Sequence, residues 1–177
     1  MALSKLSGDE QRVLFTQLCN VLDPGVAVAF SSVNREVRAS TQALLPQLKA
    51  DHDEATALGR KAGLQSCKAL REAKEVEWRY KGLTAADLKL LGTLGSVLPA
   101  LERLELYEPS GSAGLDGVQL LAEGLGAGAL PAMTWLQING MHVGDAGTSA
   151  LAAALGQGAL LRLKILFLIN AAIGDAG

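Results

Sequence analysis

The chain has 177 residues, which is enough for one packed core or one elongated stack of repeated units. Hydrophobic residues make up 49% of the chain and aromatic residues only 4%. The core must therefore consist of Leu, Ala and Val, which favours stacked strand–helix units over an aromatic-rich barrel. The formal net charge of −2 excludes a general electrostatic attraction to nucleic acid, so no nucleic-acid partner is expected.

Residue usage also indicates the compartment. Cys19 and Cys67 lie far apart and form no CxxC motif, which favours thiols in a reducing compartment over a disulfide or a metal site. Charges within residues 5–12 exclude a signal peptide. Residues 124–144 carry no formal charge, but their glycines and Pro131 exclude a membrane span. We expect a soluble cytoplasmic or nuclear protein with no membrane partner.

The N-terminal residues are predicted to begin with two short helices. The sequence from Ser7 to Glu10 is a capping box, in which Ser7 caps a helix and Glu10 reaches back to it. The dipeptide Asp23-Pro24 predicts the next helix start, with Asp23 as the N-cap and Pro24 at the first helical position.

A third helix is predicted from about Ser32. Pro46 should kink or split this helix, and Gly59 or Gly63 should end it. Residues 51–54 read Asp-His-Asp-Glu, a composition that could suggest metal binding. Adjacent residues on a helix point in different directions, so we interpret this run as a solvated charged face and expect no metal.

These helices resemble an F-box. Residues 6–9 stand where that family has L-P-x-E, spaced leucines follow within 14–22, and residues 33–35 match V-x-R. A serine replaces the proline, and residues 37–38 lack the usual Trp. The resemblance covers about residues 5–45 and implies docking to the Skp-type adaptor of a cullin ubiquitin ligase. A plain helical cap over the first repeat is the alternative, and the two are compatible.

The segment 61–97 mixes charges of both signs, which indicates a solvated surface. Residues 67–73 suit a short helix, and residues 75–80 alternate polar and apolar side chains as a half-buried strand does. Residues 84–87 form a second capping signature. The first strand–helix unit is therefore strand 75–80 followed by helix 84–94.

A unit with a period of 30 residues follows. Gly117–Ala122 aligns with Gly147–Ala152, and Gly126–Leu130 aligns with Gly156–Leu160. Apolar residues occupy positions 1, 4, 6 and 11 of the last two units: Met133, Leu136, Ile138 and Val143, then Leu163, Leu166, Leu168 and Ile173. Earlier units fit with Leu101, Leu104 and Leu106, and more weakly with Ala73, Val76, Trp78 and Leu83. A fixed period of this length predicts stacked repeats.

The repeat resembles the leucine-rich repeat in the strand-plus-helix variety of ribonuclease-inhibitor-like proteins, over roughly residues 70–177. The resemblance implies an α/β solenoid with parallel strands on its concave face and helices on its convex face, preceded by an all-α N-terminal cap. The family's Asn position holds Lys81, Met141 and Ala171, so other groups must satisfy the loop backbone.

No pattern in the chain predicts catalysis. The glycines of 124–128 follow a helix, so we interpret them as a helix end and tight turn instead of a phosphate loop. Asp145 and Asp175 are expected to be N-caps. Residues 110–114 lack the spacing of a nucleophile elbow, and His142 has no partner at triad or metal spacing. We expect no enzyme, cofactor or metal.

The side chains between the consensus leucines should form three rows across the sheet. The rows are Glu75, Arg103, Trp135, Ile165; Glu77, Glu105, Gln137, Phe167; and Arg79, Tyr107, Asn139, Ile169. Glu77 and Glu105 should be like charges side by side, or two solvated carboxylates leaning apart. Trp135 beside Arg103 is typical of an interaction hot spot. The predicted partner-binding residues are Arg79, Arg103, Glu105, Tyr107, Trp135, Gln137, Asn139 and Phe167.

The sequence therefore predicts a helical N-terminal region over 1–63 and leucine-rich repeats over 64–177, with the last repeat incomplete. Because the chain stops within a repeated phrase, we expect a fragment or shortened chain that tends to associate from about Leu160 onward. The predicted function is non-enzymatic protein binding on the concave face. The alternatives are an F-box-type substrate receptor, and a protein inhibitor or regulator of an enzyme.

Overall fold

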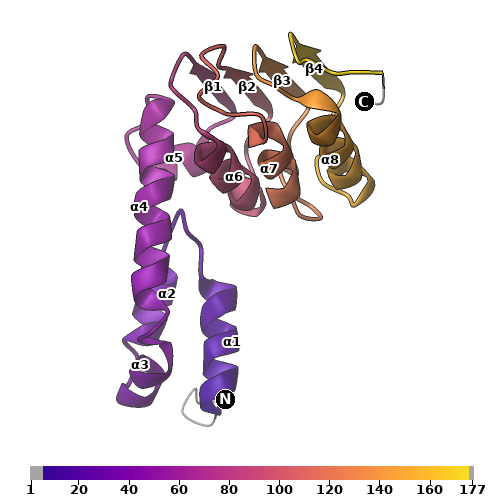
Figure 1. Cartoon of the computed structure of the whole chain (residues 1–177). Helices are drawn as coiled ribbons and strands as arrows, with labels where there is room; N and C mark the ends of the chain where they lie inside the picture. Colours follow the sequence, from indigo (N-terminus) through magenta and orange to yellow (C-terminus); the bar gives the residue numbers. More distant parts are fainter. Residues whose placement is uncertain (1–5, 176–177) are drawn as a thin grey trace. The chain divides into compact units, whose positions relative to one another are not determined.

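The computed structural model describes residues 6–175 and has a mixed α/β fold (Figure 1). The chain divides into two compact units, Met1–Ala57 and Leu58–Gly177, which we describe separately. The predicted domain boundary between residues 63 and 64 stays a prediction. Residue 5, where the F-box resemblance begins, and residues 176–177 at the end of the final repeat lie outside the described residues.

The first unit is helical. Its elements are α1 (Gly8–Leu18), α2 (Gly25–Ser31), α3 (Arg35–Thr41) and the beginning of α4 (Leu45–Lys61). One apolar cluster joins the four, formed by Phe15, Ala27, Phe30, Val37 and Leu48. The hydroxyl groups of Ser31 and Thr41 share a hydrogen bond inside this unit, with their oxygens 2.7 Å apart, and Thr41 Oγ1 donates to Val37 O.

The predicted helix starts in this unit are correct once and wrong twice. The capping box at Ser7 is confirmed, because the Glu10 amide donates to Ser7 Oγ and the Ser7 amide donates to the Glu10 carboxylate. The prediction that Asp23 is the N-cap of α2 is wrong: the Asp23 amide closes the preceding turn, and Pro24 is the N-cap residue, with its carbonyl accepting the first helical bond. The third helix begins after Asn34 rather than near Ser32, because the Asn34 side chain accepts from Val37 N.

The predicted split of the third helix is confirmed. The chain breaks between α3 and α4, which places Pro46 in the first turn of α4, where a missing N–H costs no helical hydrogen bond. The helix ends before Gly63, which has a φ of +80°. Leu64 N bonds to Gly59 O and Gly63 N bonds to Arg60 O, as in a Schellman motif.

The second unit repeats a strand followed by a helix. In chain order its elements are α5 (Cys67–Glu72), β1 (Glu75–Arg79), α6 (Ala85–Leu94), η2 (Gly95–Val97), β2 (Arg103–Tyr107), α7 (Gly117–Gly124), β3 (Trp135–Asn139), α8 (Gly144–Gly156) and β4 (Ile165–Ile169). The strands form one parallel sheet in the order β1-β2-β3-β4, and α6, α7 and α8 lie side by side along it (Figure 1). The predicted first unit is confirmed, with Thr84 as the N-cap of α6 in a capping box.

The predicted strand register is confirmed throughout the sheet. Glu75 pairs with Arg103, Arg103 with Trp135, and Trp135 with Ile165. The consensus apolar residues of the first three strands point to the core, and Trp78, completely buried, donates from Nε1 to Leu58 O. In β4, by contrast, residues on both faces are exposed or half-buried.

Two glycines set the spacing of α6 and α7. A Cβ added to Gly92 would overlap the carbonyl oxygen of Leu121, and a Cβ added to Gly124 would lie 2.9 Å from the Gly92 Cα. The two helices therefore touch backbone to backbone at this point. The glycine pattern that the sequence attributes to helix ends has a packing role here as well.

A carboxylate one unit further along satisfies the main chain of the loop after β1. Glu108, 2% exposed, accepts from Gly82 N at 2.6 Å and from Leu83 N at 3.2 Å. Ser112 Oγ donates to the Leu83 carbonyl at 2.6 Å. Glu108 thus ties the loop after β1 to the loop after β2.

The third and fourth units use main-chain bonds for the same purpose. Val143 N and Gly144 N both donate to the carbonyl of Ala171, which lies one unit further along. Cys19 is half-buried and Cys67 is buried, and neither takes part in a disulfide. Among the helices of residues 6–175, none is both long and apolar enough to cross a membrane.

Candidate functional site

The side chains of the three predicted rows line the exposed face of the sheet. Parallel strands in register bring each row together at the spacing of neighbouring strands, about 5 Å. On β1 the row residues are exposed and charged, whereas on β3 they are half-buried. On β4 they are apolar and exposed: Ile165 at 43%, Phe167 at 45% and Ile169 at 38%. The face therefore changes from charged to apolar along the sheet.

An ion pair crosses the charged end of the face. The guanidinium of Arg79 contacts the Glu105 carboxylate, and Arg79 Nε donates to Glu105 Oε1 at 2.6 Å. This hydrogen bond raises the pKa of Arg79 above its ordinary value. Gln137 Nε2 approaches the same carboxylate oxygen at 3.4 Å. Two predicted site residues, Arg79 on β1 and Gln137 on β3, thus converge on the carboxylate of a third, Glu105 on β2.

This arrangement corrects the prediction for Glu77 and Glu105. Their pairing in the register is confirmed, but they are neither an uncompensated like-charge pair nor two solvated carboxylates. Glu105 is only 6% exposed, and Arg79 neutralises it. Sequence reasoning missed this because Arg79 reaches diagonally, to a residue that is not its register partner. Glu105 orients Arg79 and Gln137 and offers little surface of its own.

An aromatic cluster occupies the centre and the apolar end of the face. The guanidinium carbon of Arg103 lies 4.4 Å from the centroid of the Trp135 ring. Trp135 also meets Phe167 edge to face, with centroids 5.9 Å apart and ring planes at 71°. The predicted contact between Trp135 and Arg103 is confirmed. These contacts hold the half-buried indole in one orientation, which lowers the entropy cost of binding against it.

Tyr80 extends the site and was missed by the sequence pattern. Strand alternation assigns it to the core, yet it is 67% exposed, because its φ of +54° turns the chain after β1. Its ring meets that of Tyr107 edge to face at 4.7 Å, and its hydroxyl donates to the Tyr107 hydroxyl at 3.1 Å. This hydrogen bond raises the pKa of Tyr80. The dipeptide Lys81-Gly82 directly after Tyr80 was the sequence signal that could have indicated a turn at this point.

The remaining predicted row residue, Asn139, stays within reach of its neighbours. Its amide oxygen accepts from Asn170 Nδ2 at 3.4 Å, and Asn170 has a φ of +52° directly after β4.

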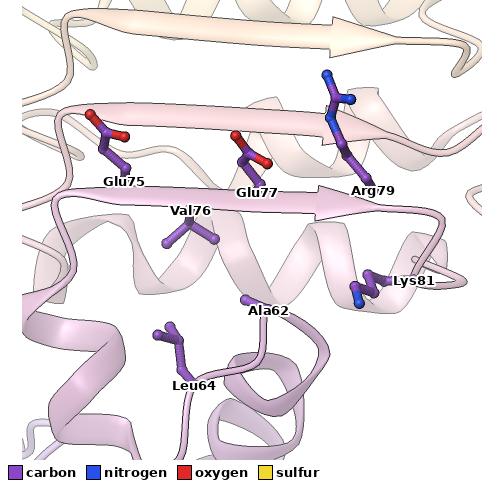
Figure 2. A pocket seen from close by; sticks show the side chains of 7 residues that line it. All are labelled: Ala62, Leu64, Glu75, Val76, Glu77, Arg79 and Lys81. Carbon is purple, nitrogen blue, oxygen red and sulfur yellow. The ribbon is translucent and has the colours of Figure 1, made fainter.

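A hollow of about 520 Å³ lies beside β1, lined by Ala62, Leu64, Glu75, Val76, Glu77, Arg79 and Lys81 (Figure 2). The charged end of the face therefore continues to an open edge of the sheet.

Other residues that the sequence singled out have structural contacts. The prediction that Asp145 is an N-cap is wrong: α8 begins at Gly144 after Val143, and Asp145 Oδ1 accepts from Gly174 N at 2.7 Å. The ring Nδ1 of His52 lies 2.6 Å from Val21 O. Gly128, with a φ of +74°, turns the chain after α7, as predicted. Within residues 6–175, no cluster of three or more His, Cys, Asp or Glu could hold a metal ion.

Comparisons of the chain with protein-family models, curated proteins and solved structures found no match. The assignment of a function therefore depends on the geometry of the sheet face.

Proposed function

We propose that this protein is a non-enzymatic interaction module, which binds a protein partner on the exposed face of β1–β4. The observation that carries the proposal is the indole of Trp135, half-buried and held between Arg103 and Phe167 at the middle of the face. A large aromatic ring in a fixed orientation, beside a positively charged group, is the most frequent kind of hot spot in protein interfaces.

We also propose that residues 70–177 form a leucine-rich repeat solenoid, with this face as its concave side. The proposal is supported by the four parallel strands, whose register partners follow one another at intervals of 28, 32 and 30 residues (75 to 103, 103 to 135 and 135 to 165). It is also supported by the helix that follows each of the first three strands. Stacked units of this kind present a row of side chains per strand position, which suits an extended protein surface.

The composition of the face defines the partner that would fit. The aromatic cluster and the apolar residues of β4 require an apolar patch on the partner, and the Arg79–Glu105 pair and the two tyrosines require a polar rim beside it. A partner with an apolar centre and hydrogen-bonding groups on one side matches this gradient. A small-molecule substrate would not need so wide a face.

The experiment is a pull-down with the full chain, followed by affinity measurement with the recovered partner. Trp135→Ala should weaken binding at least about tenfold, and Tyr107→Ala should weaken it several-fold, because both remove contact surface at the proposed interface. Glu123→Ala, on the exposed surface of α7, is the matched control and should leave affinity unchanged. Circular dichroism verifies that each variant is folded. Equal affinity of wild type and Trp135→Ala would refute the proposed face.

A second candidate is an F-box-type receptor, in which the first unit docks a Skp-type adaptor. It is favoured by five large apolar side chains there that are more than a third exposed: Val13, Leu14, Val26, Val28 and Val33. Adaptor recovery with the wild type, and its loss with a Val26→Ser, Val28→Ser variant, would support this role. Failure to recover adaptor with either chain would leave a plain helical cap. The same pull-down would identify an enzyme partner if the protein is an inhibitor or regulator.

A further inference from the structure

The outer edge of β4 presents strand hydrogen-bonding groups that β3 does not use. β4 is the last strand of the sheet (Figure 1). In a parallel pair, alternate residues of one strand bond to its neighbour, and Gly140 N, directly after β3, donates to Ile169 O at 3.0 Å. The odd-numbered residues of β4 therefore bond to β3, and the main-chain N–H and C=O groups of Leu166 and Leu168 point away from it.

The sequence of β4 is the same in both directions. It reads Ile-Leu-Phe-Leu-Ile, with Phe167 at its centre. Two copies paired antiparallel about Phe167 would therefore match each Ile with an Ile and each Leu with a Leu. Leu166 and Leu168 would form the hydrogen-bonded pairs, which is what their outward main-chain groups require. Phe167 would meet its own copy at a non-hydrogen-bonded position, where opposite side chains approach most closely.

Apolar side chains are uncovered on both faces of β4. On the exposed face of the sheet, Ile165, Phe167 and Ile169 are each at least 38% exposed, and on the opposite face Leu166 is 37% exposed. A partner laid against one face would leave the other in water, whereas a strand added at the edge contacts side chains on both faces. The exposed surface of β4 is therefore suited to an added apolar strand.

The charges around β4 favour an antiparallel copy. Lys164 and Arg162 precede the strand, whereas Asp175 follows it and Asp145 is bonded to Gly174 N at the same end. Antiparallel pairing brings the basic end of each copy to the acidic end of the other. It also separates the two Lys164 residues by six strand positions, about 20 Å, which is well beyond the screening length of about 8 Å. Parallel pairing in register would place Lys164 beside its own copy, which is unfavourable.

The other edge of the sheet is a poor match for β4. A copy that continued the stack head to tail would set the apolar row of β4 beside the exposed carboxylates of Glu75 and Glu77. Ala62 and Leu64 also stand across from β1, where the added strand would lie (Figure 2). A closed pair of copies is therefore favoured over an open-ended chain of them.

We propose that β4 is a self-recognition edge, through which two copies of this chain join their sheets antiparallel about Phe167. The two Phe167 rings then lie between the two Trp135 rings, so the aromatic clusters of both copies become one. The pairing goes beyond the function proposed for the Trp135 face and stands without it. It determines that one particle presents two such faces, and it does not determine what they bind.

The first test measures the mass of the full chain by light scattering and sedimentation over a range of concentrations. We expect the mean mass to rise to a plateau at twice the 18.4 kDa of one chain and no further. Leu166→Pro removes an N–H that faces the second copy and not β3, which an edge strand tolerates, and should raise the dissociation constant at least about tenfold. A monomer up to about 1 mM, growth beyond two copies, or an unchanged dissociation constant for Leu166→Pro would overturn the proposal.

A second arm reads the register from disulfide formation under mild oxidation. Phe167→Cys would face its own copy with Cα atoms about 4.5 Å apart, within disulfide range, and should form a covalent dimer. Ile165→Cys and Ile169→Cys should each cross-link little alone and at least about tenfold faster when mixed. The wild type, with Cys19 and Cys67, gives the background rate.

Two results of this arm would overturn the proposal. One is a Phe167→Cys chain that cross-links no faster than the wild type. The other is an Ile165→Cys chain that cross-links alone as fast as Phe167→Cys, because that pattern belongs to parallel strands in register. Circular dichroism verifies that each variant is folded.

Discussion

Glu108 shows how a single buried side chain can satisfy the main chain of a neighbouring loop. Its carboxylate accepts from the amides of Gly82 and Leu83 and from Ser110 Oγ. Burial raises its pKa, but the hydrogen bonds from Ser110, Leu83 and Gly82 outweigh burial and lower the pKa below its ordinary 4.5. The charged form is thus the form that the fold binds.

We predict that Glu108→Gln lowers the free energy of unfolding at neutral pH by about 1–2 kcal/mol, because a neutral acceptor replaces a charged one. A carboxylate with a lowered pKa in the folded state stabilises the protein above its unfolded pKa, and this contribution is lost as the pH falls below 4.5 through the folded pKa. The difference between wild type and variant should therefore shrink below that pH. Urea unfolding at several pH values measures it, and a difference independent of pH would contradict this role.

The elements of the second unit are spaced by their smallest residues. The contact of Gly92 with Gly124 allows α6 and α7 to approach until their backbones touch. In both helices the apolar periodicity identifies a buried face, but it does not specify how closely two such faces approach. That distance follows from which residues lack a side chain at the crossing point.

We predict that Gly92→Ala destabilises the protein, although alanine is the better helix former by about 1 kcal/mol. The new methyl group would overlap the Leu121 carbonyl, a main-chain atom that no rotamer change can move, and such overpacking typically costs about 1–3 kcal/mol. Thermal unfolding should show a lower Tm. Gly126→Ala is the control, because a Cβ there meets no atom within 4 Å. An equal or higher Tm for Gly92→Ala would exclude a tight crossing.

At the scale of the whole molecule, the sheet has two unlike edges. The edge at β1 carries charges, whereas β4 is apolar on both faces, with Phe167 at 45% and Leu166 at 37% exposed. An apolar strand with one open edge is a favourable template for pairing with another chain. The prediction that association involves the region from Leu160 onward is therefore best tested on this strand.

We predict that the isolated protein self-associates with rising concentration, and that an Ile165→Thr, Phe167→Thr variant associates less. Threonine retains the preference for a strand but removes apolar surface. Light scattering coupled to gel filtration measures the mean mass at each concentration. Leu161→Ser removes an apolar side chain that lies outside the strand and is even more exposed, at 75%, and it should change little. If Leu161→Ser lowers the mean mass as much, association does not depend on β4.

The sequence alone determined the order of strands and helices in the second unit and the register of all four strands. The physical reason is that the apolar period is a one-dimensional property: residues 30 apart with the same neighbours adopt the same local structure and stack. The capping boxes at Ser7 and Thr84 were readable for a different reason, because their partners lie only three residues away.

Only the tertiary structure decided which side chains serve another unit. Glu105 binds Arg79, Glu108 binds the loop after β1, and Asp145 binds Gly174, and each of these partners is 25 to 29 residues away. No periodic pattern encodes such pairs, because each depends on the reach of one side chain across a gap set by packing. The strand period thus specifies the sheet. The burial and the ion pairs of the row side chains decide which of them remain available to a partner.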